Sequence, residues 1–421
     1  MGDLLRFATA GSVDDGKSTL IGRLLHDSKT LFEDQLEAVA RTSEQRGHVG
    51  VDLALITDGL RAEREQGITI DVAYRYFATP RRTFIIADTP GHAQYTRNMV
   101  TGASTADLAV ILLDARAGIV TQTRRHAAIA GMLGIRRVVL AVNKMDLVDW
   151  SEQRFDELAE EFACFADPLG FVEIRPIPMS AFLGDNVVEP SASLLWYAGP
   201  TLLDHLETVP IEPPGSCGEA AADSAGARLA VQWVIRPRPG AAQDGRRYAG
   251  TIASGRFAAG DPVVVLPGGQ RTTIAGVEIA DGTLSEAFAP AAVSLRLTDD
   301  IDVGRGDLIA TASDQPLETR AVNATVCWFS ERPLRPGARV AIRHTTRTVK
   351  AVATALVDRL DVTNLHRDLA PSELVMNDLG TVTFTLAGSL AVDPYNTNRA
   401  TGSFVVVDES TNETIGAGLV A

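Results

Sequence analysis

A glycine-rich segment near the N-terminus, residues 11–18 (GSVDDGKS), constrains the fold of this chain more than any other feature. It has the spacing G-x-x-x-x-G-K-[ST]; an apolar run precedes it at residues 4–10, and apolar residues follow it at helical spacing. A strand, a tight turn and a helix in this order place backbone amides at a helix N-terminus, where they can hold a phosphate group. A chance glycine turn is the alternative, and the strand-to-helix setting favours a phosphate loop.

The residue types inside this loop suit phosphate chemistry. Gly11 and Gly16 allow a tight backbone path that brings amides close to phosphate oxygens. The Lys17 ammonium can reach the β- and γ-phosphates of a nucleotide, and the Ser18 hydroxyl can bind Mg²⁺. We therefore expect a nucleotide to contact the following residues: Gly11, Ser12, Val13, Asp14, Asp15, Gly16, Lys17, Ser18 and Thr19.

Apolar runs alternate with helical segments through the first half of the chain. Residues 83–88 (TFIIAD), 108–114 (LAVILLD) and 138–143 (VVLAVN) read as buried strands, because their apolar residues are continuous. Such alternation of strands and helices implies a mostly parallel sheet with helices on both faces. We assign residues 1–211 to this α/β domain.

The second half of the chain has a different pattern. Residues 212–227 are rich in Pro, Gly, Ala and Ser and are predicted to be a linker. Beyond them, short runs rich in valine or aromatic residues are separated by Gly, Pro or Asp turns, which is typical of antiparallel β-barrels. We predict one barrel over residues 228–315 and a second over residues 316–421.

The composition is that of an ordinary globular protein, with 45% hydrophobic and 22% charged residues. A formal net charge of -14 disfavours a protein that coats nucleic acid through clustered basic residues. The three cysteines are odd in number and far apart, which fits a reducing cytoplasm better than a disulfide framework. Because no signal peptide or apolar membrane span is evident, we expect a soluble cytoplasmic protein with neither a membrane nor a nucleic acid as partner.

Residues 88–91 (DTPG) follow a predicted strand, so the Asp88 carboxylate emerges at a strand's carboxyl end, where α/β sheets gather ligands. Asp88 can hold Mg²⁺ through water, and Thr89 and Pro90 continue the loop past the nucleotide. The Gly91 amide can contact the γ-phosphate and lose that contact after hydrolysis, which would make the following segment a switch. D-x-x-G is also a common turn, so the motif indicates a nucleotide site only in combination with the other motifs.

A second strand end carries the residues expected to recognise the base: Asn143, Lys144 and Asp146. The Asp146 carboxylate can accept both the N1 and N2 protons of guanine; adenine lacks this pair and would leave a buried acceptor unsatisfied. Asn143 is expected to tie this loop to the phosphate loop, and the Lys144 stem to cover the base. Ser180 and Ala181 follow another apolar strand, and the Ala181 amide could contact guanine O6.

Two residues are assigned to catalysis together with Lys17. Thr69 lies in residues 67–70 (GITI), where a mobile loop could bring its hydroxyl to Mg²⁺ and its amide to the γ-phosphate; a strand beginning is the alternative. His92 follows Gly91 directly and is the candidate that orients the attacking water.

The order of these motifs along the chain is informative in itself. The phosphate loop, the threonine loop, D-x-x-G, N-K-x-D and S-A occur in the sequence expected of a GTPase, each beside suitable secondary structure. We therefore predict GTP and Mg²⁺ as cofactors. The expected metal-site residues are Ser18, Thr69 and Asp88.

Together with the two predicted barrels, the motifs resemble translational GTPases across nearly the whole chain. Three longer stretches are more specific: residues 11–29 (GSVDDGKSTLIGRLLHDSK), 58–77 (DGLRAEREQGITIDVAYRYF) and 87–107 (ADTPGHAQYTRNMVTGASTAD). These resemble the large GTPase subunit of ATP sulfurylase. In the translational relatives an apolar pair flanks the catalytic histidine, and Val13 and Ile68 match that pair.

The resemblance implies a division of work between two polypeptides. GTP binding and hydrolysis here would drive the adenylation of sulfate by ATP on a small catalytic partner subunit, yielding adenosine 5′-phosphosulfate and diphosphate. Some relatives also carry an adenylylsulfate kinase as a fusion. This sequence shows no second phosphate loop, so we expect no such kinase within it.

Two other functions remain open from the motifs alone. A translation factor that delivers aminoacyl-tRNA would have the same fold and GTP chemistry, but the DDGKS loop and the match over residues 61–77 favour sulfate activation. A GTP-binding scaffold that hardly hydrolyses GTP is the third reading, and His92 and Thr69 argue against it.

Overall fold

The structure, a computed structural model, describes residues 3–28, 71–211, 226–236, 245–280 and 282–421. The chain forms two compact units: Met1–Glu212 with Val362–Leu365, and Pro213–Asp361 with His366–Ala421. Among the described residues, no helix is long and apolar enough to cross a membrane. Residues 67–70, with Thr69, and most of the predicted linker lie outside the described residues.

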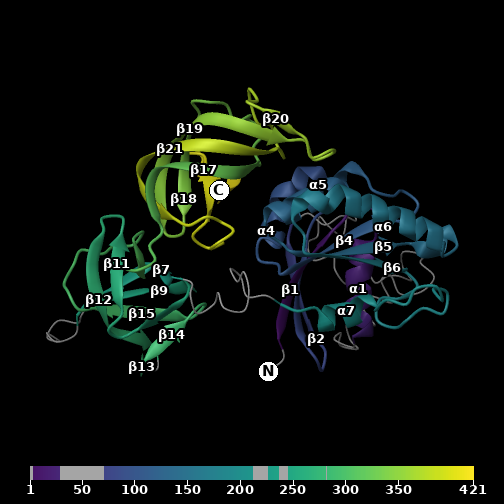
Figure 1. Cartoon of the computed structure of the whole chain (residues 1–421), viewed down its shortest axis with the longest axis horizontal. Coiled ribbons are helices and arrows are strands. Elements are labelled where there is room, and N and C mark those ends of the chain that lie inside the picture. Colours follow the sequence, from purple (N-terminus) through teal and green to yellow (C-terminus); the bar gives the residue numbers. More distant parts are fainter. Residues whose placement is uncertain (1–2, 29–70, 212–225, 237–244, 281) are drawn as a thin grey trace. The chain divides into compact units, whose positions relative to one another are not determined.

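The first unit is built on a six-stranded sheet with the order β2-β3-β1-β4-β5-β6 (Figure 1). The strands are β1 (Leu4–Ala10), β2 (Ala73–Ala78), β3 (Thr83–Asp88), β4 (Leu108–Asp114), β5 (Arg137–Asn143) and β6 (Glu173–Pro178). β2 runs antiparallel to β3, and the other neighbouring strands are parallel. The predicted, mostly parallel sheet is confirmed.

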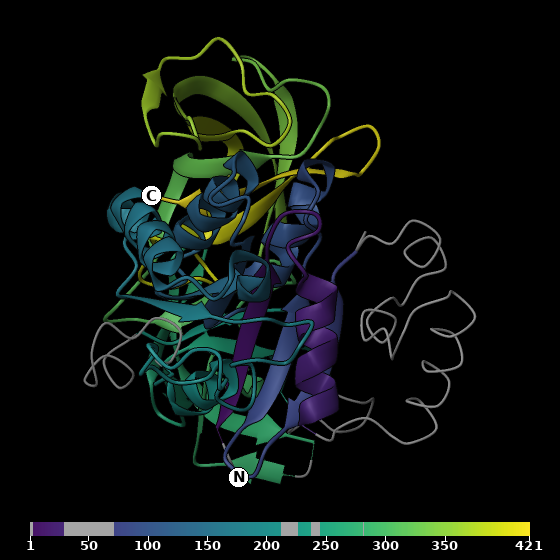
Figure 2. The same ribbon diagram turned by 90° about the vertical axis from the view of Figure 1, so that its right-hand side faces the viewer.

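Helices cover both faces of this sheet, as predicted. They are α1 (Lys17–Asp27), α4 (Thr96–Ala103), α5 (Thr121–Met132), α6 (Glu152–Ala166) and α7 (Leu202–Thr208), with short 3₁₀ helices at Ala93–Tyr95, Met145–Val148 and Asp167–Leu169. Figure 1 shows α4, α5 and α6 on one side of the strands, and α1 and α7 on the other. In Figure 2, α1 (purple) lies along the sheet.

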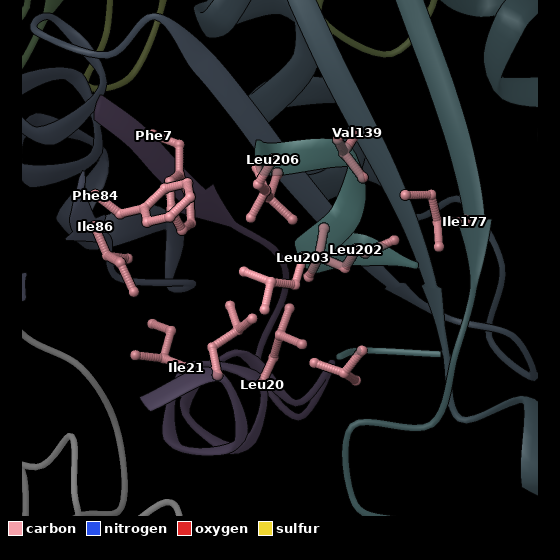
Figure 3. Packing of buried hydrophobic residues seen from close by; sticks show 14 of the residues in the cluster. Phe7, Leu20, Ile21, Phe84, Ile86, Val139, Ile177, Leu202, Leu203 and Leu206 are labelled. Carbon is pink, nitrogen blue, oxygen red and sulfur yellow. The ribbon is translucent and has the colours of Figure 1, made fainter. Parts of the chain in front are cut away.

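The core of the first unit explains why the central strands are apolar throughout. All seven residues of β4 are buried, because helices cover the sheet on both sides. On one side, α1 buries Leu20 and Ile21 and α7 buries Leu202 and Leu206 against the strands. Figure 3 shows these side chains pointing toward one another. This packing fixes the position of α1 and therefore the position of the phosphate loop that leads into the helix.

The second unit contains two antiparallel barrels. The strands of the first are β7 (Arg228–Ala230), β8 (Trp233–Ile235), β9 (Arg247–Ser254), β10 (Arg256–Ala258), β11 (Pro262–Leu266), β12 (Gln270–Ile279), β13 (Gly282–Leu284), β14 (Glu286–Phe288), β15 (Ala292–Leu297) and β16 (Leu308–Thr311). The order β11-β16-β7-β9-β15-β12 closes because β11 also pairs with β12. Closure removes exposed sheet edges.

The second barrel follows the same plan. Its strands are β17 (Leu317–Trp328), β18 (Arg339–His344), β19 (Arg347–Leu360), β20 (Arg367–Leu369), β21 (Leu379–Val392), β22 (Ser403–Val407) and β23 (Thr414–Val420). The order β18-β22-β23-β17-β21-β19 closes through a β18–β19 pairing. Two antiparallel barrels after an α/β domain are therefore confirmed, while the exact domain limits stay predictions.

Candidate nucleotide site

The phosphate loop joins β1 to α1 in the first unit. Gly16 directly precedes α1 and has a φ of 94°, a left-handed conformation that favours glycine. A Cβ atom on Gly16 would lie 2.5 Å from Nδ2 of Asn143, so space as well as conformation requires glycine here. The predicted strand, turn and helix are thus in place, and the residue 16 backbone packs against the Asn143 side chain at the end of β5.

Lys17 places a buried ammonium group in the loop. Its Nζ donates hydrogen bonds to the carbonyl oxygens of Gly11 (3.1 Å) and Ser12 (3.3 Å). Burial lowers the pKa of Lys17, and the carboxylates of Asp88 and Asp15 act in the opposite direction. A buried cation of this kind is suited to neutralising a phosphate group, as the sequence predicts.

The carboxyl ends of β1 and β3 are tied together beside this lysine. Thr89 Oγ1 donates to the carbonyl oxygen of Thr9 (2.6 Å), and Thr9 Oγ1 donates to Oδ1 of Asp88 (3.4 Å). Asp88 is only 1% exposed. Ser18, another predicted metal ligand, is half-buried in the first turn of α1. The hydroxyl and carboxylate oxygens at this end of the sheet are ligands that Mg²⁺ accepts.

Gly91 packs its backbone against the phosphate loop. A Cβ atom on Gly91 would lie 2.6 Å from Nζ of Lys17 and 2.7 Å from the carbonyl oxygen of Gly11. His92 follows it, half-buried, with its ring at 6.2 Å from the ring of Tyr95 in an edge-on arrangement. The structure therefore brings the D-x-x-G segment to the lysine that was predicted to reach the γ-phosphate.

Asn143 joins the base loops to the phosphate loop. Its Nδ2 donates to the carbonyl oxygen of Asp15 (2.7 Å), and its Oδ1 accepts from the amide of Ala181 (2.9 Å). The first hydrogen bond confirms the predicted tie to the phosphate loop. The second engages the same amide that was predicted to contact guanine O6, so that predicted contact would have to share this hydrogen. Ser180 is buried and its Oγ accepts from the amide of Leu183 (3.3 Å).

Asp146 has the property expected of a base-reading carboxylate. Its Oδ1 is buried and has no hydrogen-bond partner among the described residues. A buried acceptor without a donor costs free energy, and the paired N–H groups of guanine would satisfy it. The residues present therefore fit a guanine nucleotide.

The sequence did not single out Asp114, one of the two residues that hold Lys144. Its Nζ donates to the carbonyl oxygen of Asp14 and to Oδ2 of Asp114 (3.0 Å). Arg116 also donates two hydrogen bonds to the Asp114 carboxylate, from Nε (3.1 Å) and from Nη2 (2.6 Å). Burial alone would raise the pKa of Asp114, but the hydrogen bonds from Arg116 and Lys144 outweigh it and lower the pKa. Asp114 ends a predicted strand, as Asp88 does, and that position was the available signal.

Comparisons with known proteins agree with this geometry. Residues 3–211 match the family of the elongation factor Tu GTP binding domain, and residues 321–421 match the GTP-eEF1A C-terminal domain-like family. The fold and the site together define a GTPase of the elongation factor Tu type.

Proteins that are similar to this chain over its full length narrow the assignment to one family of such GTPases. The chain is 52% identical over 421 residues to sulfate adenylyltransferase subunit 1 of Methylorubrum populi, covering 99% of this chain and 87% of that protein. It is 47% identical over 420 residues to the subunit 1 of Colwellia psychrerythraea, covering 99% and 88%. It is also 55% identical over 421 residues to the bifunctional enzyme CysN/CysC of Mycobacterium tuberculosis, covering 100% of this chain and 67% of that protein. The chain belongs to the sulfate adenylyltransferase subunit 1 family.

Proposed function

We propose that this chain is the GTPase subunit of a sulfate adenylyltransferase. GTP hydrolysis here drives the adenylation of sulfate by ATP on a small catalytic partner subunit, which yields adenosine 5′-phosphosulfate and diphosphate. The observation that carries the proposal is the 52% identity, over 99% of this chain, to a sulfate adenylyltransferase subunit 1. The words "subunit 1" in that relative's name support a second polypeptide as partner.

The phosphate side of the site supports GTP hydrolysis. Lys17 offsets the charge of the β- and γ-phosphates from its buried position between the carbonyl oxygens of Gly11 and Ser12. Ser18 and Asp88, together with Thr69, would hold Mg²⁺, which supplies charge neutralisation at the transferred phosphoryl group. His92, next to the segment that touches Lys17, orients the attacking water.

The base side of the site supports specificity for guanine. The unpaired Oδ1 of Asp146 accepts from guanine and rejects adenine, which offers no matching pair of donors. The Lys144 ammonium is held by Asp14 and Asp114, which supports the proposed role of its stem in covering the base. Asn143 hydrogen-bonds to both Asp15 and Ala181, so it fixes the position of the base loop relative to the phosphate loop.

Coupling to sulfate follows from energetics. A phosphosulfate anhydride is a high-energy product, so its formation needs a second reaction that releases free energy. A GTPase can provide it only if the partner subunit binds the GTP and GDP states with different affinity. The contact between Gly91 and Lys17 lies where a γ-phosphate would be added or lost, so it is the proposed origin of the two states.

Location and domain limits are also proposed. The three cysteines of the sequence, few, odd in number and far apart, support a reducing compartment, the cytoplasm. The proposed domains are residues 1–211, 228–315 and 316–421, and the boundary at residue 315 is supported by the end of β16 at residue 311 and the start of β17 at residue 317.

The test is a reconstitution with the partner subunit. The chain is co-purified with it, and formation of adenosine 5′-phosphosulfate from ATP and sulfate is measured with and without GTP. We expect GTP to increase product formation, and His92→Ala to abolish that increase while GTP binding is retained. Binding of aminoacyl-tRNA without any effect of GTP on sulfate adenylation would instead identify a translation factor.

A further inference from the structure

Arg23, on α1, reaches the loop that follows β6. Its Nη2 donates to the carbonyl oxygen of Phe182 (2.6 Å), and its Nε donates to the carbonyl oxygen of Ala181 (3.3 Å). Ala181 and Phe182 follow Arg23 in the chain by 158 and 159 positions, respectively. The Arg23 side chain is 21% exposed; its hydrogen bond to Ala181 is partly buried, and the one to Phe182 is exposed. Its nearest acidic neighbour, Asp27, is 3.7 Å away and contributes only a weak ion pair.

The contact gives both polar backbone groups of Ala181 a side-chain partner, one acceptor and one donor. The amide of Ala181 donates to Oδ1 of Asn143 (2.9 Å), while its carbonyl oxygen accepts from Arg23 (3.3 Å). Ala181 is fully buried, so losing either partner would leave a polar backbone group unsatisfied. The residue predicted to read guanine O6 is therefore fixed from both sides.

The remaining hydrogen bonds of this loop are internal and do not anchor it to the phosphate loop. Ser180 donates its amide to the carbonyl oxygen of Asp185 (3.1 Å), and its own carbonyl oxygen accepts from the amide of Gly184 (2.8 Å). Arg23 packs beneath this turn, because a Cβ atom on Gly184 would lie 3.4 Å from Cδ of Arg23. The guanidinium fork matches two carbonyl oxygens at once, which a lysine ammonium cannot do in the same fixed geometry.

We propose that Arg23 is a positioning residue for guanine recognition: it fastens the base loop at residues 180–184 to the helix that begins with the phosphate-binding Lys17. Arg23 follows Lys17 by six positions, about 9 Å along the helix axis. One helix thus carries both the phosphate contact and the support of the base loop. This inference rests on the proposed binding of guanine nucleotides.

The test compares GDP with 6-thioguanosine diphosphate, two nucleotides that differ only in the atom carried by C6. Both present the N1 and N2 protons that Asp146 is proposed to accept, but in the analogue sulfur, a weak acceptor, replaces O6. For Arg23→Ala we expect GDP to dissociate about tenfold faster than from the unsubstituted chain, because the base loop no longer holds its position. Dissociation of the thio analogue should change by less than about twofold, since its sulfur forms at most a weak hydrogen bond with the base loop. Arg23→Lys should give an intermediate effect on GDP.

Arg82→Ala is the matched control. Arg82 also donates to two backbone carbonyl oxygens, those of Leu206 (2.9 Å) and Val209 (2.7 Å), but at α7. It should lower the thermal midpoint without changing the ratio of the two dissociation rates. Equal acceleration for both nucleotides in Arg23→Ala would assign Arg23 a merely structural role and overturn the inference, as would no acceleration. If the unsubstituted chain shows no preference for guanine nucleotides, the proposed function itself fails.

Discussion

The backbone of Gly91 lies against the side chain of Lys17, so closely that a Cβ atom on Gly91 would be 2.6 Å from Nζ of that lysine. The same atom would be 2.7 Å from the carbonyl oxygen of Gly11, which belongs to the backbone and cannot rotate away. Any methyl group at position 91 must therefore displace either the D-x-x-G segment or the phosphate loop. This relationship makes the segment sensitive to what the phosphate loop holds.

Gly91→Ala should impair hydrolysis more than nucleotide binding. The added methyl group prevents the residue 91 amide from approaching the γ-phosphate, whereas the base and the other phosphates keep their contacts. We expect the rate of GTP hydrolysis to fall at least about tenfold, which corresponds to a loss of one weak hydrogen bond to charged phosphate in the transition state. Single-turnover hydrolysis and GDP affinity measure the two effects separately, and equal losses in both would contradict this role.

Asn143→Asp should uncouple the base loops from the phosphate loop. The carboxylate can still accept from Ala181, but it cannot donate to the carbonyl oxygen of Asp15. With a buried acceptor unpaired, we expect a loss of about 2 kcal/mol in stability and a weaker affinity for GDP. Asn398→Asp is the control, because Asn398 also donates through Nδ2, to Ser254 Oγ (2.9 Å) in the second unit. It should lower stability and leave GDP affinity unchanged; reduced affinity there would count against the assignment.

His126 should make the stability of the first unit depend on pH. Burial, and after it the positive charge of Lys17, lowers the pKa of His126 to about 3. Since its ordinary pKa is near 6.5, the unfolded chain binds more protons between pH 3 and 6.5, and stability falls as pH decreases through that range. Between pH 6.5 and 5.5 we expect this residue to account for about 1 kcal/mol.

His126→Met isolates that contribution. The thermal midpoint of the variant should fall less steeply below pH 6.5 than that of the unsubstituted chain, and the two profiles should be parallel between pH 7 and 8. His205 is another buried histidine with a lowered pKa, so some acid sensitivity should remain. Identical slopes below pH 6.5 would show that His126 is not held neutral.

The sequence predicts the parts of this fold that depend on short stretches of chain. Residues 108–114 are apolar throughout because both faces of β4 are covered, and that run alone indicates a buried strand. The tie from Asn143 to the phosphate loop was predicted because the motif defines it. Residues 229–235 are mostly apolar but form parts of two strands, β7 and β8, because Val231 and Gln232 donate their amides to separate partners, Asp307 and Ala249.

Contacts between distant residues could not be predicted in the same way. Arg23 and Ala181 are 158 positions apart, and an arginine on a helix face is usually a solvated charge. Asp114 likewise looks like the polar end of a strand until Lys144, 30 positions later, is brought beside it. Both contacts depend on which strands lie next to one another in the sheet. A local sequence pattern does not give that order.

The central claim is that a guanine nucleotide, read by Asp146 in this chain, drives sulfate adenylation on the partner. Asp146→Asn replaces an acceptor by an amide, which suits xanthine, so GTP affinity should fall on the order of 100-fold and xanthosine triphosphate should bind instead. The decisive measurement is formation of adenosine 5′-phosphosulfate by the Asp146→Asn complex with each triphosphate. We predict that xanthosine triphosphate increases product formation and GTP does not. An increase with GTP alone, or the same product formation without any triphosphate besides ATP, would contradict the account.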